Sequence, residues 1–175
     1  MKTLVVSVLL CAMMVLSRTA DAVPFFPLYL LPQAQSPRVK RSTSCPNHWT
    51  EISGRCFRYV ANRLNWGNAE KNCIGMGAHL ASVHSANEYQ DIQKMIVVAN
   101  GGFGRTWLGG SDCQTEGIWL WSDGTVFDYK HCGKFDNRWW KQHCLQMNYG
   151  EHKCWDDVQC SSTLPSVCAK KVHDS

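Results

Sequence analysis

The chain has 175 residues and a formal net charge of +4 at pH 7, with 18 Lys and Arg against 14 Asp and Glu. From Ser42 onward it has 13 of each sign, so the basic excess lies before Ser42, and a basic surface for nucleic acid or an anionic membrane is not expected. The 134 residues from Ser42 to Ser175 are enough for one domain with a hydrophobic core.

Residues 1–22 have the features of a secretory signal peptide. Lys2 precedes an apolar run from Leu4 to Leu16, and the segment ends at Ala20-Asp21-Ala22, with small residues where a signal peptidase reads. The alternative is a membrane anchor, but the run is too short to cross a bilayer comfortably. We therefore expect export and removal of this segment, which also removes Cys11.

Residues 23–41 are predicted to be a propeptide. They contain four prolines, which disfavour a stable helix. They end in Arg38-Val39-Lys40-Arg41, which resembles a furin-type processing site. The alternative is a basic linker that is never cut. Cleavage leaves residues 42–175 as the mature domain, which is expected to be secreted and extracellular.

Nine cysteines lie between Cys45 and Cys168, which predicts a disulfide framework with one thiol left over. A metal-binding cluster fits less well, because the chain has no Cys-x-x-Cys pair and its seven histidines are scattered. Spacing alone does not give the connectivity. Local sequence suggests that Cys45 and Cys56 flank two strands closed by a turn, and that Cys168 pairs far back along the chain.

The first half of the domain is predicted to contain a strand pair and two helices. We expect strand structure over 49–60, interrupted by a turn, and a helix over 65–76, where apolar residues recur at three- and four-residue steps. A second helix is expected to begin with a capping box, in which Ser85 is the N-cap and the Glu88 side chain reaches back to it. This helix is predicted to stop at the glycines that follow Asn100.

The second half is predicted to consist of short strands around a long loop. Strands over 106–109 and 118–121 precede a stretch from Ser122 to about Lys141 that has little periodicity. A long loop of this kind tends to carry function rather than packing. Three closing strands are expected over 144–148, 153–156 and 166–170.

Several short motifs occur in a fixed order in this region. They include His79-Leu80-Ala81-Ser82, Trp107-Leu108-Gly109-Gly110, Trp119-Leu120-Trp121-Ser122-Asp123-Gly124 and Cys154-Trp155-Asp156-Asp157. With the cysteines around them, they make residues 45 to about 170 resemble the C-type lectin-like domain family. The resemblance implies an α+β, disulfide-stapled fold with two helices, two small antiparallel sheets and a long loop region.

The resemblance also implies how the cysteines pair. The implied disulfides are Cys45–Cys56, Cys73–Cys168, Cys144–Cys160 and Cys132–Cys154, the last as in fish type II antifreeze proteins and related fish lectins. In those antifreeze proteins a fifth bridge joins the position of Cys113 to a cysteine just before Cys144, where this chain has His143. Cys113 is therefore expected to be unpaired, which leaves either a disulfide-linked homodimer or a buried, inert thiol.

Family members that bind sugar do so through calcium, which takes six to eight oxygen ligands. The resemblance places the ligand positions at Lys134-Phe135-Asp136, Gln142, Asp156 and Asp157. Lys134 has an ammonium group that repels a cation. Phe135 replaces a proline that follows a cis bond in the family, and a cis bond without proline costs about 2.5–4 kcal/mol. Three carboxylates remain as convincing ligands, so calcium is possible but not expected as a cofactor.

Two questions stay open for the long loop. The Lys134 ammonium either neutralises the neighbouring carboxylates, which would otherwise raise one another's pKa, or points into water. Trp139 and Trp140 either stack on a sugar or anchor a protein partner, or they pack beneath the loop. Phe135 and Tyr149 are compatible with both arrangements of the tryptophans.

The favoured function is a secreted lectin that binds glycans or glycoproteins with weak or no calcium dependence. The alternatives are a type II antifreeze protein, which binds ice, and a protein-binding module of the same fold. An enzyme is not expected, because Ser82, Ser85, His79 and His84 lie in a structural motif of the family. The candidate ligand-binding residues are Lys134, Phe135, Asp136, Trp139, Trp140, Gln142, Asp156 and Asp157.

Overall fold

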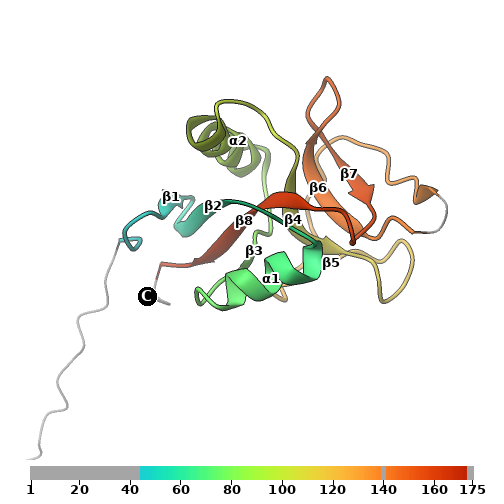
Figure 1. Cartoon of the computed structure of the whole chain (residues 1–175), viewed down its shortest axis with the longest axis horizontal. Helices are drawn as coiled ribbons and strands as arrows, with labels where there is room; N and C mark the ends of the chain where they lie inside the picture. Colours follow the sequence, from blue (N-terminus) through green and yellow to red (C-terminus); the bar gives the residue numbers. More distant parts are fainter. Residues whose placement is uncertain (1–43, 139–140, 173–175) are drawn as a thin grey trace, which may run out of the picture. The chain divides into compact units, whose positions relative to one another are not determined.

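The computed structural model describes residues 44–138 and 141–172 (Figure 1). The predicted signal peptide (1–22) and propeptide (23–41) lie outside the described residues, as do Trp139 and Trp140. The described residues form β1 (Thr50–Ile52), β2 (Arg55–Leu64), α1 (Trp66–Ile74), β3 (His79–Leu80), α2 (Ala86–Asn100), β4 (Thr106–Ser111), β5 (Leu120–Trp121), β6 (Cys144–Tyr149), β7 (Cys154–Val158) and β8 (Leu164–Lys171). No helix in this part of the chain is long and apolar enough to span a membrane.

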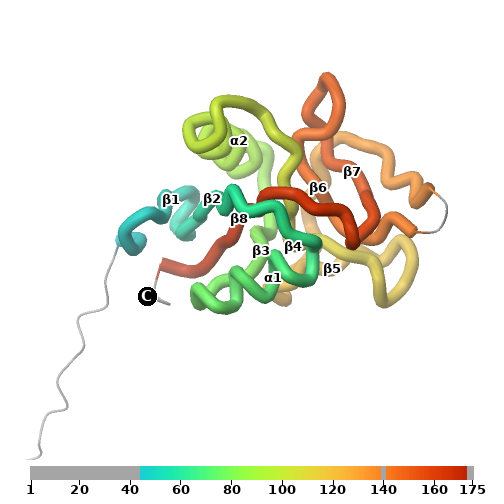
Figure 2. Tube along the Cα trace, in the orientation of Figure 1, coloured from blue at the N-terminus to red at the C-terminus, as the bar shows by residue number. Residues whose placement is uncertain are grey.

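The strands form one mixed sheet in the order β1-β2-β8-β4-β6-β7, with β3 paired to β8 and β5 paired to β4. The pairings are antiparallel except for β4 and β8, which run parallel and meet at Trp107 and Ser166. The two small antiparallel sheets implied by the resemblance are therefore two halves of one sheet, joined by this parallel contact. Helix α1 packs beside β3 and β8, and α2 packs beside β1 and β2 (Figures 1 and 2).

Both predicted helices are present, and their ends follow local sequence. The Asn65 side chain caps α1 by accepting a hydrogen bond from the Asn68 amide, and Ser85 caps α2 by accepting one from the Glu88 amide. Gly101 ends α2 with a φ of 74°, a left-handed conformation that glycine adopts without steric cost. The turn expected within 49–60 lies at Ser53 and Gly54, between β1 and β2.

The Glu88 side chain is one detail that the capping-box prediction placed wrongly. Its carboxylate does not reach back to the Ser85 amide. One oxygen accepts from the His84 amide at 2.8 Å, and the other accepts from the Arg55 guanidinium at 2.6 Å. Glu88 is buried, with 4% of its side chain exposed, so a fixed positive charge nearby competes successfully with the local cap.

Two clusters of buried residues form the core. One lies around Trp121, Trp155 and the inner face of α2, and the other around Trp107 and the apolar face of α1. Two of the four disulfides lie in the second cluster. The bonded pairs are Cys45–Cys56, Cys73–Cys168, Cys132–Cys154 and Cys144–Cys160, which are the pairs implied by the resemblance. The thiol of Cys113 is free and exposed, so the alternative of a buried, inert thiol is wrong.

Replacing Glu88 with Ala should destabilise the domain by about 3 kcal/mol, because the Arg55 guanidinium, 19% exposed, then loses its main partner. The value is at the low end for a broken buried pair, since Asp123 still lies 3.9 Å from Arg55. Urea unfolding with the disulfides intact measures the change. The matched control on the same helix is Asp91→Ala, which breaks the exposed Asp91–Lys94 pair and should cost less than about 0.5 kcal/mol. Equal losses in the two variants would contradict this account.

Candidate ligand-binding site

The candidate site is built on the hairpin of β6 and β7. In this hairpin Asp156 lies opposite Gln146 and Asp157 lies opposite Leu145. Trp155 and Asp157 are buried, whereas Asp156 between them is half-buried, as expected for alternating faces of a strand. The strand therefore sends one carboxylate under the long loop and the other toward its rim.

The Asp157 carboxylate holds the long loop against the hairpin. One oxygen accepts from the Asp136 amide at 3.2 Å and the other from the Asn137 amide at 2.6 Å. Burial raises the pKa of Asp157, and these amide donors act in the opposite direction by favouring the charged form. Asp157 is only 1% exposed, so its charge is used inside the protein to fix the backbone of the loop.

The loop is also closed by side-chain bonds on both sides of residues 139–140. The Gln142 side-chain oxygen accepts from the Arg138 amide at 2.6 Å, and the Gln142 amide donates to the Asn137 side chain at 3.0 Å. Asn137 has a φ of 37°, and asparagine tolerates this left-handed region better than most residues. Its side-chain amide donates to Glu116. These bonds hold the two sides of the loop to each other.

The cation nearest Asp136 is Arg138, not Lys134. The Arg138 guanidinium lies 3.1 Å from the Asp136 carboxylate, and this contact raises the pKa of Arg138. Lys134 is exposed, and among the described residues its ammonium forms no ion pair within 4.0 Å. Lys134 therefore does not neutralise the carboxylates as one of the two hypotheses proposed. The positive charge beside Asp136 instead belongs to Arg138, four residues after Lys134, whose guanidinium offers several donors.

Asp156 is a half-buried acidic group at the rim of the site. Its carboxylate accepts from the Gln146 side chain at 2.8 Å. Burial is the main cause that raises its pKa, and the negative charges of Asp157 and Asp136 act in the same direction. The Gln146 bond and Arg138 oppose this shift. A half-buried carboxylate of this kind gains from any ligand that supplies a further hydrogen-bond donor.

Phe135 packs away from the carboxylates. Its ring centroid lies 4.8 Å from that of Trp119, and the Lys130 ammonium lies 3.7 Å above the ring. A cation over an aromatic face is attracted by the ring quadrupole. The peptide bond before Phe135 is trans, in line with the expectation that the loop does not keep the cis shape of the family. Phe135 thus belongs to an apolar cluster beneath the loop.

A cavity of about 320 Å³ lies between the loop and the hairpin. Its polar lining residues are Lys134, Asp136, Arg138, Gln142, Glu151, His152 and Asp156, and Tyr149 adds an aromatic ring. Gly133 shapes the floor, because a Cβ atom there would lie 2.0 Å from the Trp155 carbonyl oxygen. Its φ of 123° also disfavours other residues, so the close approach of loop and strand requires glycine.

The structure separates the predicted site residues into three groups. Those that line the cavity are Lys134, Asp136, Gln142 and Asp156. Asp157 lies beneath the loop and Phe135 in the apolar cluster, whereas Trp139 and Trp140 lie outside the described residues. The sequence prediction missed Arg138, Asn137 and Gln146. Arg138 follows the predicted triplet by two residues, and its charge was the available signal.

The residues at this site do not fit a calcium ion. Calcium needs six to eight oxygens, yet both Asp157 oxygens already accept amide hydrogens, and so does the Gln142 side-chain oxygen. The Arg138 guanidinium lies beside Asp136, where it would repel a divalent cation. The oxygens at these positions therefore serve N–H donors of the loop.

A second polar cluster has the distances of a catalytic triad but not its accessibility. His84 lies with one ring nitrogen 3.1 Å from the Ser82 hydroxyl and the other 2.8 Å from Asp128. Ser82 is fully buried, and its hydroxyl donates to Asp123 at 2.5 Å. A nucleophile must reach its substrate, and this hydroxyl is already committed to a carboxylate. The cluster therefore serves to fix the segment Trp121-Ser122-Asp123-Gly124 to the core.

Comparison with known proteins gives one consistent group. The family model for the lectin C-type domain matches residues 62–170. Ladderlectin of Oncorhynchus mykiss is 34% identical, covering 98% of this chain and 95% of that protein. A type-2 ice-structuring protein of Brachyopsis segaliensis is 36% identical, covering 95% of this chain and 98% of that protein. The crystal structure of a calcium-independent type II antifreeze protein is 40% identical with a TM-score of 0.66, covering 73% of this chain and 95% of that one.

Calcium at 1 mM should leave the melting temperature of the domain unchanged, because the loop donors compete for the oxygens. A calcium site with a dissociation constant of about 10 µM would instead raise the free energy of unfolding by about 2.7 kcal/mol under these conditions. Thermal unfolding with calcium and with chelator makes the comparison. In the control variant Asp157→Asn the bonds to the loop should weaken. The free energy of unfolding should fall by about 1–2 kcal/mol, and calcium should not alter this loss. A calcium-dependent rise in the wild type that the variant lacks would refute this reading.

Proposed function

We propose, from the premise that this chain belongs to the C-type lectin domain family, that it is a secreted protein that binds carbohydrate with weak or no calcium dependence. The cavity between the loop and the β6–β7 hairpin is the proposed binding site. The proposed ligands are glycans and glycoproteins. The single observation that carries the proposal is that this cavity combines charged donors and acceptors with an exposed aromatic ring.

The chemistry of the cavity suits the hydroxyl groups of a sugar. Each hydroxyl both donates and accepts, so it needs acceptors such as Asp136 and Asp156 and donors such as Arg138. Tyr149 is 43% exposed at the same cavity and offers a ring on which the apolar face of a pyranose can stack. The half-buried Asp156 carboxylate gains most from a hydroxyl donor, because the protein supplies it with few of its own.

Weak calcium dependence follows from the hydrogen bonds of the loop. The oxygens that would hold a metal accept N–H groups of residues 136, 137 and 138. Sugar hydroxyls would thus contact protein groups directly instead of completing a metal's coordination. This supports recognition by charge-assisted hydrogen bonds, which are stronger than neutral ones.

Ice binding is the second candidate, and the similarity to type-2 ice-structuring proteins favours it. The cavity argues against it. Its lining carries both signs of charge, from Lys134 and Arg138 to Asp136, Asp156 and Glu151, and such groups keep a strongly held hydration shell. A protein-binding role for the same surface remains the third candidate, and an enzymatic role is not proposed.

Secretion to an extracellular, oxidising compartment is supported by the disulfides. Four bonded pairs within one small domain are typical of exported proteins and rare in the cytosol. The predicted signal peptide and propeptide agree with this proposal, because their removal would release the domain that begins near Ser42. No partner among nucleic acids or membranes is proposed, since the mature domain has balanced charges.

The mature domain should bind members of a glycan array to the same extent with calcium and with chelator. Arg138→Ala should weaken binding at least about tenfold, because a charge-assisted hydrogen bond contributes about 1.5–3 kcal/mol. Lys141→Ala is the matched control, since Lys141 is an exposed cation of the same loop that does not line the cavity. Loss of binding in chelator, or equal effects of both variants, would contradict the proposal. Thermal hysteresis in place of glycan binding would favour ice as the ligand.

The exposed Cys113 thiol also supports a disulfide-linked homodimer. In that case a fraction of the wild type should migrate as a dimer on a non-reducing gel and as a monomer after reduction, while the remaining monomer keeps the free thiol, whereas Cys113→Ser should be monomeric in both. A monomer under oxidising conditions would rule out this use of the thiol.

A further inference from the structure

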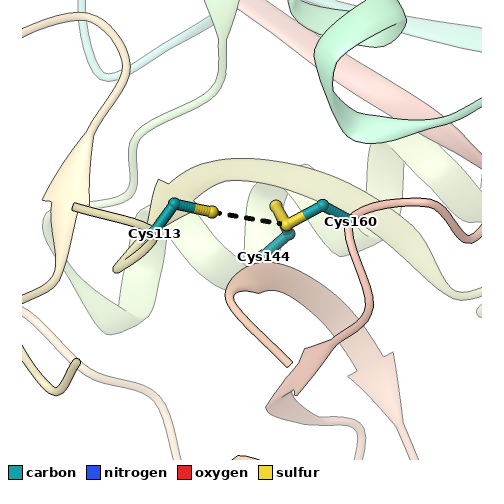
Figure 3. A group of neighbouring side chains, drawn as sticks. All are labelled: Cys113, Cys144 and Cys160. Carbon is teal, nitrogen blue, oxygen red and sulfur yellow. Dashed lines mark hydrogen bonds between the residues drawn. A yellow bond between two sulfur atoms is a disulfide. The ribbon is translucent and has the colours of Figure 1, made fainter. Parts of the chain in front are cut away.

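The thiol of Cys113 is not isolated, because it lies beside a disulfide. Its sulfur is 3.6 Å from the sulfur of Cys160, which is bonded to Cys144 (Figure 3). The three sulfurs all lie within 4.8 Å of one another. Cys113 is exposed, whereas Cys144 is fully buried at the start of β6. A free thiol in contact with a disulfide is the starting point for thiol–disulfide exchange, which proceeds by attack of the thiolate along the axis of the sulfur–sulfur bond.

The backbone holds Cys113 in this position. Ser111 pairs with Cys144 across β4 and β6, and the Asp112 amide donates to the His143 carbonyl at 3.2 Å. The next residue, Cys113, donates its amide to the Ser111 hydroxyl at 3.2 Å and its thiol to the His143 carbonyl at 3.8 Å. The continuation of the β4–β6 ladder thus delivers the thiol to the bridge.

We propose that Cys113 is the nucleophile of an internal exchange that switches the domain between two disulfide isomers. The Cys113 thiolate attacks the sulfur of Cys160, a Cys113–Cys160 bond forms, and the Cys160–Cys144 bond breaks. The electron pair leaves on Cys144, which then takes a proton from solvent, while Cys113 has given up its own. One thiol and one disulfide stand on each side of the reaction, so no oxidant or reductant is consumed.

The exchange requires the turn that carries Cys113 to move, and the domain tolerates both products. The sulfur–sulfur contact of 3.6 Å must shorten to a bond of about 2.05 Å, and the thiol must swing onto the extension of the Cys144–Cys160 bond, because the three sulfurs now lie within 4.8 Å of one another. Cys113 is exposed, so this movement displaces solvent and not core residues. The leaving Cys144 lies in the apolar cluster that includes Trp107 and Leu164. A neutral thiol behaves there as a small apolar side chain, so the second isomer leaves no buried charge.

The exchange would change how the candidate site is tethered. In the isomer of the structure the bridge ties the start of β6, two residues after Gln142, to the segment that follows β7. In the second isomer the start of β6 is released and the end of β7 is tied to the turn after β4. The loop next to the cavity therefore gains freedom in one isomer. The exchange itself does not depend on which ligand the cavity binds.

Disulfide mapping of the mature wild-type domain tests the proposal. The monomer is held in a glutathione redox buffer, quenched with acid, unfolded, alkylated and digested without reduction, and the peptides are analysed by mass spectrometry. We expect a Cys113–Cys160 peptide together with alkylated Cys144. In Cys113→Ser the alkylated fraction of Cys144 should fall at least about tenfold, because its attacking thiol is absent. Equal Cys144 alkylation in the two proteins would overturn the proposal.

A second variant traps the product. In Cys144→Ser the remaining Cys113 and Cys160 should bond to each other, so that Ellman's reagent finds no thiol in the unfolded chain. Two thiols per chain would overturn the proposal. If this variant does not fold, the wild-type mapping still decides the question. Wild-type material that is entirely a covalent dimer through Cys113 would also overturn it, because the nucleophile would already be spent between copies.

Discussion

The buried carboxylate of Asp157 determines the shape of the upper part of the domain. It accepts the amides of Asp136 and Asn137, and so fixes the turn from which Arg138 projects beside Asp136. Each oxygen of this carboxylate already accepts one amide hydrogen, so a cation would have to compete with these two donors for the same negative charge. A carboxylate held by these N–H groups fixes the backbone of the loop beside the cavity.

The sheet and the disulfides below the loop stabilise the domain independently of the loop's own contacts. The parallel contact of β4 and β8 joins two antiparallel halves into one sheet, and four disulfides join strands of that sheet to neighbouring segments. Bridges restrict the unfolded chain and so stabilise the domain without needing a metal. Two of them flank the site, at Cys132–Cys154 and Cys144–Cys160, so the loop is anchored at both ends. Binding groups can then sit on irregular backbone, as they often do on a rigid scaffold.

How far the sequence led can be judged from particular residues. Caps, turns and helices depend on neighbours in the chain, and Asn65, Ser85 and Gly101 all act where local sequence placed them. Contacts across the fold were harder, because they depend on which charge is closest in space. The Glu88 carboxylate binds Arg55 and not the Ser85 amide at the start of its own helix. Arg138, and not Lys134, forms the ion pair with Asp136. Neither pairing produces a periodic pattern in the sequence, so neither could be predicted without the three-dimensional structure.

The position of Cys113 shows how one substitution can change the chemistry of a framework. His143 lies next to Cys113 just beyond the β4–β6 ladder, and its imidazole binds Asp112 at 3.0 Å instead of offering a sulfur. The thiol is then left beside the nearest bonded sulfur, that of Cys160. A buried thiol is inert because no reactant reaches it, and an exposed thiol far from any disulfide reacts only with oxidants and disulfides in solution. This thiol is both exposed and in contact with a bridge, so reactants outside the protein and a disulfide inside it compete for the same sulfur. The fold sets this competition, because the β4–β6 pairing that positions Cys113 also positions the end of the loop at the candidate site.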